Sequence, residues 1–322
     1  MTEPAEYQSD ASTPGAGASV LDHLRQVAEA MRVMLDACRK HGEAPKVEDV
    51  HRLRTGTRRV EAALETLARE AGARGLGKAT EEARQRWLKQ LKKIRRAAGT
   101  VRDFDVHREL IAESFLSAPH AAAASGKATP LIEQAHALDA WLKDRRTAAA
   151  ETLASTLGDH AGLLLDAEKQ FLTAISQRRS ILRRAHRPAS RLALEDYMRL
   201  MDAMPLLDKE NLHDFRKGAK KARYVAESDD NDPGAAAMAK AVKRVQDSIG
   251  DWHDWEVVAE EAGEALGNDG AALQTELQSR AQRAYDQALR VTSTMGRRFI
   301  GEWRASRPPR ERPRYVRSRP SS

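Results

Sequence analysis

Two stretches of the chain carry similar cationic side chains at the same spacing. In residues 50–65 (VHRLRTGTRRVEAALE) and 212–227 (LHDFRKGAKKARYVAE), a histidine is followed by an arginine after three residues and by an arginine or lysine after seven. Arginine offers a fixed fork of donors and lysine a compact cation, and both bind phosphate oxygens. Histidine adds a donor whose protonation an anion favours. These positions predict an anion site formed by His51, Arg54, Arg58, His213, Arg216 and Lys220.

A second pair of stretches repeats in the same order. It consists of residues 91–106 (LKKIRRAAGTVRDFDV) and 242–257 (VKRVQDSIGDWHDWEV). The first pair is offset by 162 residues and the second by 151. Because two spaced motifs recur in order, we interpret the chain as duplicated, with each half an α-helical bundle.

Helical periodicity places the cationic positions beside buried seams. Apolar or small residues recur at steps of three and four in all four stretches, as in Val50, Leu53 and Thr57. The cationic positions are shifted from these seams by one residue, or about 100° of helix rotation. We therefore expect half-buried side chains that line a groove. Gly99 and Gly250 interrupt the stripe, either for close approach to the helix backbone by another group or for close helix packing.

The composition favours an all-α fold of two pseudo-symmetric, duplicated helical bundles that face a central basic groove. Strong helix formers dominate and aromatic residues make up only 5% of the 322 residues. We place the boundary between the halves at Gly158. The predicted organisation is a disordered N-terminus (1–19), one helical domain (20–302) with halves 20–157 and 159–302, and a disordered Arg/Pro-rich tail (303–322).

The formal net charge of +7 is unevenly distributed. Basic stretches without acids, such as residues 178–191, alternate with acidic stretches. Either this segregation produces strong local electric fields, or the basic stretches are only solvated helix faces. No apolar run is long enough to span a membrane, and the N-terminal segment lacks the apolar core of a secretory signal. With Cys38 as the single cysteine, a disulfide framework is excluded. We expect a cytoplasmic protein.

At the four motifs the chain resembles the CHAD family of α-helical domains with characteristic histidines. The first motif stands here as His51-Arg54-Arg58-Arg59 and is followed by Gly99-Arg102-Asp103-Asp105. In the second half the family pattern reads His213-Arg216-Lys220-Arg223-Tyr224 and then Gln246-Asp247-Gly250-His253-Asp254. The resemblance spans about residues 20–302, with the motifs in family order.

The resemblance implies a protein that binds inorganic polyphosphate in a basic cavity between two four-helix bundles. It also implies an association with polyphosphate granules. Glu61, where the family usually has an arginine, would weaken the local field, and no sequence signature of the companion triphosphatase occurs. We expect no catalytic residues, no metal and no cofactor. The candidate polyphosphate-binding residues are His51, Arg54, Arg58, Arg59, Lys92, Arg102, His213, Arg216, Lys217, Lys220, Arg223, Lys243, Gln246 and His253.

Three other functions remain alternatives at this point. A metal-dependent phosphohydrolase acting on polyphosphate or nucleotides could use the histidines and Asp103, although the neighbouring arginines would repel a cation. A histidine phosphotransfer module would be phosphorylated on His213. Non-specific nucleic-acid binding could involve the arginines of the tail, because phosphate contacts need only positive charge. The groove itself lacks the aromatic residues on which bases stack.

Overall fold

The computed structural model describes residues 20–71, 75–117, 129–177, 188–227 and 232–306. Every element in these ranges is a helix, which confirms the all-α fold. No described helix is both long and apolar enough to cross a membrane. In chain order the elements are α1 (Val20–His41), α2 (Val47–Glu70), α3 (Lys78–Ile111), the π-helix η2 (Ala112–Leu116), α5 (Thr129–Ser176), α7 (Ala189–Ala203), α8 (Leu212–Ala226), α9 (Pro233–Leu266), the 3₁₀-helix η3 (Gly267–Gly270) and α10 (Ala271–Ser306).

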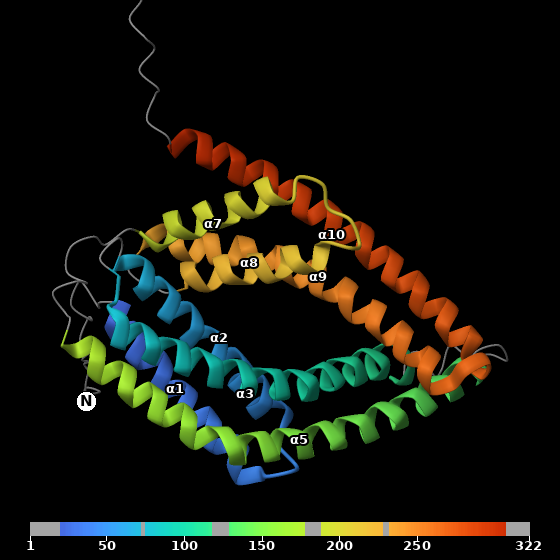
Figure 1. Ribbon diagram of the computed structural model, residues 1–322. Coiled ribbons are helices and arrows are strands. Elements are labelled where there is room, and N and C mark those ends of the chain that lie inside the picture. Colours follow the sequence, from blue (N-terminus) through green and yellow to red (C-terminus); the bar gives the residue numbers. More distant parts are fainter. Residues whose placement is uncertain (1–19, 72–74, 118–128, 178–187, 228–231, 307–322) are drawn as a thin grey trace, which may run out of the picture.

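The helices form two groups that lie one above the other (Figure 1). The lower group contains α1, α2, α3 and α5, and the upper group contains α7, α8, α9 and α10. Contacts between the groups run through α2 with α8, α3 with α9, and α5 with α9 and α10. The motif helices of one group therefore lie against the motif helices of the other.

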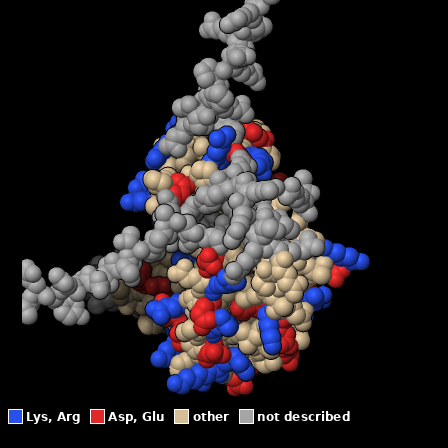
Figure 2. Space-filling view, turned by 90° about the vertical axis from the view of Figure 1, so that its left-hand side faces the viewer, with Lys and Arg blue, Asp and Glu red and all other residues tan. Residues whose placement is uncertain are grey.

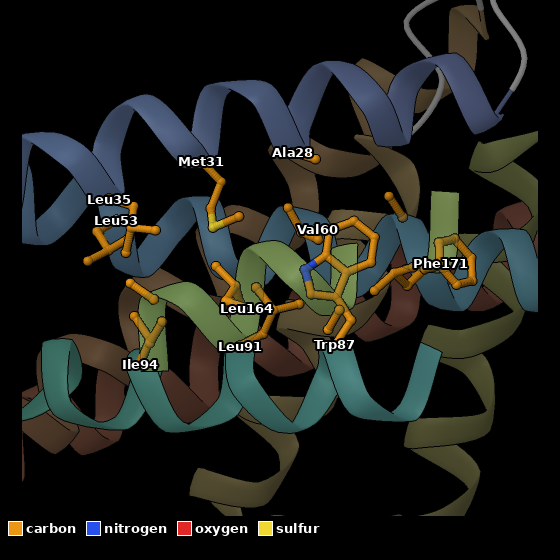
Figure 3. Close-up of a cluster of buried hydrophobic side chains, with 14 of the residues drawn as sticks. Ala28, Met31, Leu35, Leu53, Val60, Trp87, Leu91, Ile94, Leu164 and Phe171 are labelled. Carbon is orange, nitrogen blue, oxygen red and sulfur yellow. The ribbon is translucent and has the colours of Figure 1, made fainter. Parts of the chain in front are cut away.

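The first group encloses its own hydrophobic core, part of which is drawn in Figure 3. Trp87 of α3 and Phe171 of α5 are fully buried there, with ring centroids 5.7 Å apart. Met31 of α1 and Val60 of α2 close the same core from the other side. Burial of these large side chains fixes the orientation of α2 and α3, and hence of the motif residues on their neighbouring faces.

The second group has a separate core in which Tyr197, Phe215 and Phe299 pack edge to face. A third cluster joins the ends of α3, α5, α9 and α10, where the two groups meet at the right of Figure 1. All four predicted seams are confirmed as core: Val50, Leu53, Thr57, Val60, Leu64, Leu67; Leu91, Ile94, Ala98, Val101; Leu212, Phe215, Ala219, Ala222; and Val242, Val245, Ile249, Trp252.

The repeated glycines Gly56 and Gly218 lie at equivalent helix contacts. A Cβ on Gly56 would come 3.0 Å from the sulfur of Met34 in α1, and one on Gly218 would come 2.5 Å from Leu200 in α7. Each glycine thus allows the preceding helix to approach its motif helix closely. The pseudo-symmetry between the halves stays a prediction.

Two predicted boundaries are wrong. Gly158 lies inside α5, which continues to Ser176 because its apolar face packs along α3 and contributes to the first core as far as Ile175. The second core begins at Leu192, so the groups divide after α5 and not at Gly158. At the other end, α10 extends to Ser306, beyond the predicted start of the tail at 303. The predicted disordered N-terminus (1–19), residues 307–322 of the predicted tail (303–322), and residues 178–187 of the basic stretch 178–191 lie outside the described residues.

Candidate functional site

Four cationic side chains from two helices meet where α2 lies against α8. Arg54 and Arg58 belong to α2, and Arg216 and Lys220 belong to α8. All four are half-buried, as the one-residue shift from the seams predicts. They are also close enough for each guanidinium to lower the pKa of Lys220. We call these four residues the basic cluster.

A glycine in the facing helix makes room for Arg216 of the cluster. The guanidinium of Arg216 lies against Gly250 of α9, where an added Cβ would come 2.7 Å from Nη2 and 3.3 Å from Cζ. The Nε of Arg216 donates to the backbone oxygen of Gln246, at 3.3 Å. In the other half, an added Cβ on Gly99 of α3 would lie 3.5 Å from Nε of Arg54. At Gly250 the close approach of a side chain to the helix is therefore observed, whereas at Gly99 an added Cβ would make only ordinary contact.

Arg54 is held on its other side by Asp103 of α3, with 3.5 Å between Nη2 and Oδ1. Its Nε is buried and has no hydrogen-bond partner among the described residues. A buried guanidinium N–H without an acceptor is costly. A ligand that supplies an oxygen at this position would relieve that cost.

Burial and repulsion between neighbouring cations lower the pKa values of Arg58, Arg216 and Lys220. Burial together with the charge of Arg54 lowers the pKa of Arg58 to about 10. Burial lowers the pKa of Arg216 as well, although Asp254 opposes the shift. Lys220 responds most strongly, because burial and three neighbouring guanidinium groups lower its pKa to about 6. Positive charge therefore exceeds negative charge at the cluster, and an anion would be stabilised there.

The predicted histidines lie beside the cluster. His213 of α8 and His253 of α9 face each other, with ring centroids 4.6 Å apart. Burial followed by the charge of His253 lowers the pKa of His213 to about 4. Burial and then Arg216 lower the pKa of His253, and burial and then Arg102 lower that of His51. At neutral pH the histidines are therefore hydrogen-bonding groups, and a bound anion would favour their charged form.

A cleft of about 160 Å³ opens between α2 and α8 at the cluster. We call it the α2–α8 cleft. Arg58 and Lys220 line it together with Lys217, Lys221 and Tyr224, while Glu61, Ala62 and Glu65 complete the wall. The carboxylates do not neutralise the cluster, because Glu65 pairs with Lys221 at 2.9 Å and Glu61 pairs with Arg95 of α3.

Several predicted residues are exposed and do not belong to the cluster, although Lys217 lines the α2–α8 cleft beside it. Arg59 is exposed and lines a different cleft of about 500 Å³ between α1, α8 and α9. Lys92 is exposed on α3. Lys217 and Lys243 are exposed and pair with acids on their own helices, Asp214 at 2.8 Å and Asp247 at 2.5 Å.

Three further predicted residues are partly or wholly enclosed. Arg223 is half-buried over the ring of Tyr224 and pairs with Glu227 at 3.2 Å. Arg102 is half-buried and lies 3.9 Å from Glu109. Gln246 is only 2% exposed, and neither its amide nitrogen nor its amide oxygen has a partner in the described parts of the chain. Its side chain is therefore too deeply enclosed to line an open groove in this structure.

The prediction omitted acids and bases that shape the cluster. Asp254 of α9 lies near Arg216 and Lys220, and burial raises the pKa of its carboxyl group. Asp254 could have been included from the sequence, because it follows His253 directly in the fourth motif. Arg95 belongs to the cationic stripe of α3, but its pairing with Glu61 depends on how α2 and α3 pack. No group of three or more His, Cys, Asp or Glu in the described residues is arranged to hold a metal ion.

A family model for the CHAD domain matches residues 22–263, about three quarters of the chain. The chain belongs to the CHAD family. A solved structure, the crystal structure of the CHAD domain from the plant Ricinus communis, is 20% identical and superposes with a TM-score of 0.56. The alignment covers 94% of this chain and 98% of the plant domain, so the two share a fold. No curated protein matches this sequence.

Proposed function

We propose that this CHAD protein binds inorganic polyphosphate at the α2–α8 cleft and does not hydrolyse it. The observation that carries the proposal is the convergence of four cations from two helices, of which Arg58 and Lys220 lack a carboxylate within 4 Å among the described residues. Charge-assisted hydrogen bonds from such groups to phosphate oxygens are stronger than neutral ones.

The spacing of the cations favours a repeating anion over a single phosphate. Arg54 and Arg58 are one helical turn apart on α2, and so are Arg216 and Lys220 on α8. Residues four apart rise by about 6 Å along a helix, so each helix offers two contacts in a row. Tyr224, the aromatic residue of the α2–α8 cleft, is only 8% exposed, which leaves no open ring on which a nucleic-acid base could stack.

Binding of long-chain polyphosphate against single- and double-stranded DNA at several salt concentrations tests this function. Each phosphate contact contributes about −0.7 to −0.9 to the slope of log affinity against log salt, so four contacts give roughly −3. Arg54→Ala/Arg216→Ala should weaken polyphosphate binding and flatten this slope. Arg96→Ala/Arg244→Ala is the matched control, because it removes two exposed arginines from α3 and α9 and leaves the cluster intact.

The alternatives correspond to other outcomes of the same assay. Binding of DNA as tight as that of polyphosphate would support non-specific nucleic-acid binding through the tail. The same conclusion would follow if binding were lost when the tail arginines from Arg307 to Arg319 are replaced by glutamine in the full chain. Shortening of the polyphosphate chain on addition of Mg²⁺ or Mn²⁺ would support a phosphohydrolase. Equal affinities of the cluster variant and its control would refute the cluster as the binding site.

A further inference from the structure

Lys220 differs from its basic neighbours on α8 in having no acidic partner. Lys217 forms an ion pair with Asp214 at 2.8 Å, and Lys221 forms one with Glu65 at 2.9 Å. No carboxylate in the described ranges lies within 4 Å of Lys220. Nevertheless Lys220 is half-buried, whereas Lys217 and Lys221 are exposed. The enclosed lysine is thus the one without a counter-ion.

The charged groups that face Lys220 are mostly positive. Across the contact, α2 presents Arg54 and Arg58, and α8 itself presents Arg216 one turn away. Asp254 of α9 is the acid that acts on it from beyond ion-pair distance. Other titratable groups on the surrounding elements include His253 and Asp251 on α9, Glu61 and Glu65 on the cleft wall of α2, and His213, Lys217, Lys221 and Tyr224 on α8; Asp103 of α3 acts on the neighbouring Arg216.

An ammonium group in this position is unfavourable for two physical reasons. Burial removes part of its hydration, and three guanidinium groups repel it. Arginine keeps its proton in proteins, so the lysine is the member of the cluster that gives up charge. These effects together hold the pKa of Lys220 at about 6, below neutral pH.

We propose that Lys220 is a neutral amine in the free protein and takes up one proton from solvent when a phosphate chain enters the α2–α8 cleft. The incoming oxygens supply the counter-ion that Lys220 lacks, and the amine becomes an ammonium group that donates to them. The proton comes from the buffer, whose acid form loses it. This coupling requires the polyphosphate binding proposed above, and it makes that binding dependent on pH at one identified residue.

The sign of the pH dependence follows from this coupling. Below pH 6 Lys220 is already protonated in the free protein, so polyphosphate binding adds few protons at this residue. Above pH 6 each binding event must bring a proton, and affinity falls by up to about tenfold per pH unit for one proton. His51, His213 and His253 also have lowered pKa values, and a bound anion would favour their protonation too, so their contribution must be separated from that of Lys220 by substitution.

Titration calorimetry of the full chain with long-chain polyphosphate tests the coupling at pH 7.5. Interior phosphates of a long chain do not titrate near this pH, so the heats in buffers of different ionisation enthalpy report protons taken up by the protein. We expect net uptake by the wild type and about one proton less per occupied cleft for Lys220→Arg, which should bind at least as tightly. Lys240→Arg, a substitution of the same type at an exposed position of α9 outside the α2–α8 cleft, should retain the full uptake.

Competitive labelling of the free protein with trace acetic anhydride gives an independent measurement that needs no ligand or variant. The reactivity of Lys220, followed by mass spectrometry against pH, should titrate near 6. An ordinary titration of Lys220 would overturn the inference. So would equal proton uptake by Lys220→Arg and wild type, even with tight binding. Absence of any polyphosphate binding would instead overturn the proposed function.

Discussion

Replacement of Gly250 by alanine should separate polyphosphate binding from stability. The new Cβ would lie 2.7 Å from Nη2 of Arg216, whereas ordinary contacts need about 3.5 Å or more. The guanidinium is the mobile end of a long side chain, so it would move away by about 1 Å rather than unfold the helix. It would then lose its position against α9 and its hydrogen bond to the backbone oxygen of Gln246.

The expected magnitude follows from one charged contact. A hydrogen bond to a charged group contributes about 1.5–3 kcal/mol, so Gly250→Ala should weaken polyphosphate binding by roughly 10- to 100-fold. Stability should change little. Alanine gains up to about 1 kcal/mol of helix propensity over glycine, and the lost hydrogen bond costs about as much. Calorimetry at fixed salt and urea unfolding measure the two quantities.

Gly99→Ala is the matched control in the first half. Its Cβ would lie 3.5 Å from Nε of Arg54, which is ordinary contact, so binding should stay within about twofold of wild type. In addition, Gly250→Ala should have no further effect on binding once Arg216 has been replaced by alanine. Equal losses in the two glycine variants, or additive effects of Gly250→Ala and Arg216→Ala, would refute the view that Gly250 acts by positioning Arg216.

Three further predictions concern stability. Arg146→Ala should lower the free energy of unfolding in urea by about 3–5 kcal/mol, because the carboxylate of Asp105, which is 7% exposed, loses its partner at 2.7 Å. Arg145→Ala, at an exposed neighbouring position, is the control and should lower it by less than about 1 kcal/mol. The pKa of His213 is about 4 in the folded protein and 6.5 in a free side chain, so the unfolded state binds more protons between these pH values. Stability should therefore fall as the pH drops from 6.5 towards 4, and His213→Gln should reduce this dependence of the unfolding free energy on pH. Trp87→Ala should lower the unfolding free energy by about 3–5 kcal/mol through a cavity in the first core, measurable by thermal unfolding.

Periodicity was sufficient to predict the seams and the half-burial of the four residues of the basic cluster, but His51, Lys92 and Lys243 of the same stripe are exposed. Val50 and Leu91 are fully buried as expected, and Arg54 lies at the edge of the seam. The failure at Gly158 has a clear cause, since a single glycine costs a helix only about 1 kcal/mol and the packing of α5 on α3 exceeds that. Propensity at one residue therefore did not decide where the long helix ends.

Which members of the stripe converge could not be predicted from the stripe itself. The one-residue shift predicts the direction of each side chain around its own helix. Arg58 and Lys220 share a cleft because α2 and α8 pack close together, which the pattern on one helix does not contain. The same angle leaves Lys92 exposed and encloses Gln246. The outer faces differ from the basic cluster in their charge pattern. In the lower part of Figure 2, basic and acidic residues are interspersed.

The acids beside the basic cluster explain how it can exist in a folded protein and still attract an anion. Asp103 contacts Arg54, and Asp254 lies near Arg216, so each outer arginine has a carboxylate from the facing helix. Four cations and two acids leave a formal charge of +2, and a neutral Lys220 reduces it to +1. Mutual repulsion in the free protein is therefore moderate. Under the proposed coupling, a phosphate chain that restored the proton on Lys220 would meet the larger charge only once its own oxygens were present to balance it.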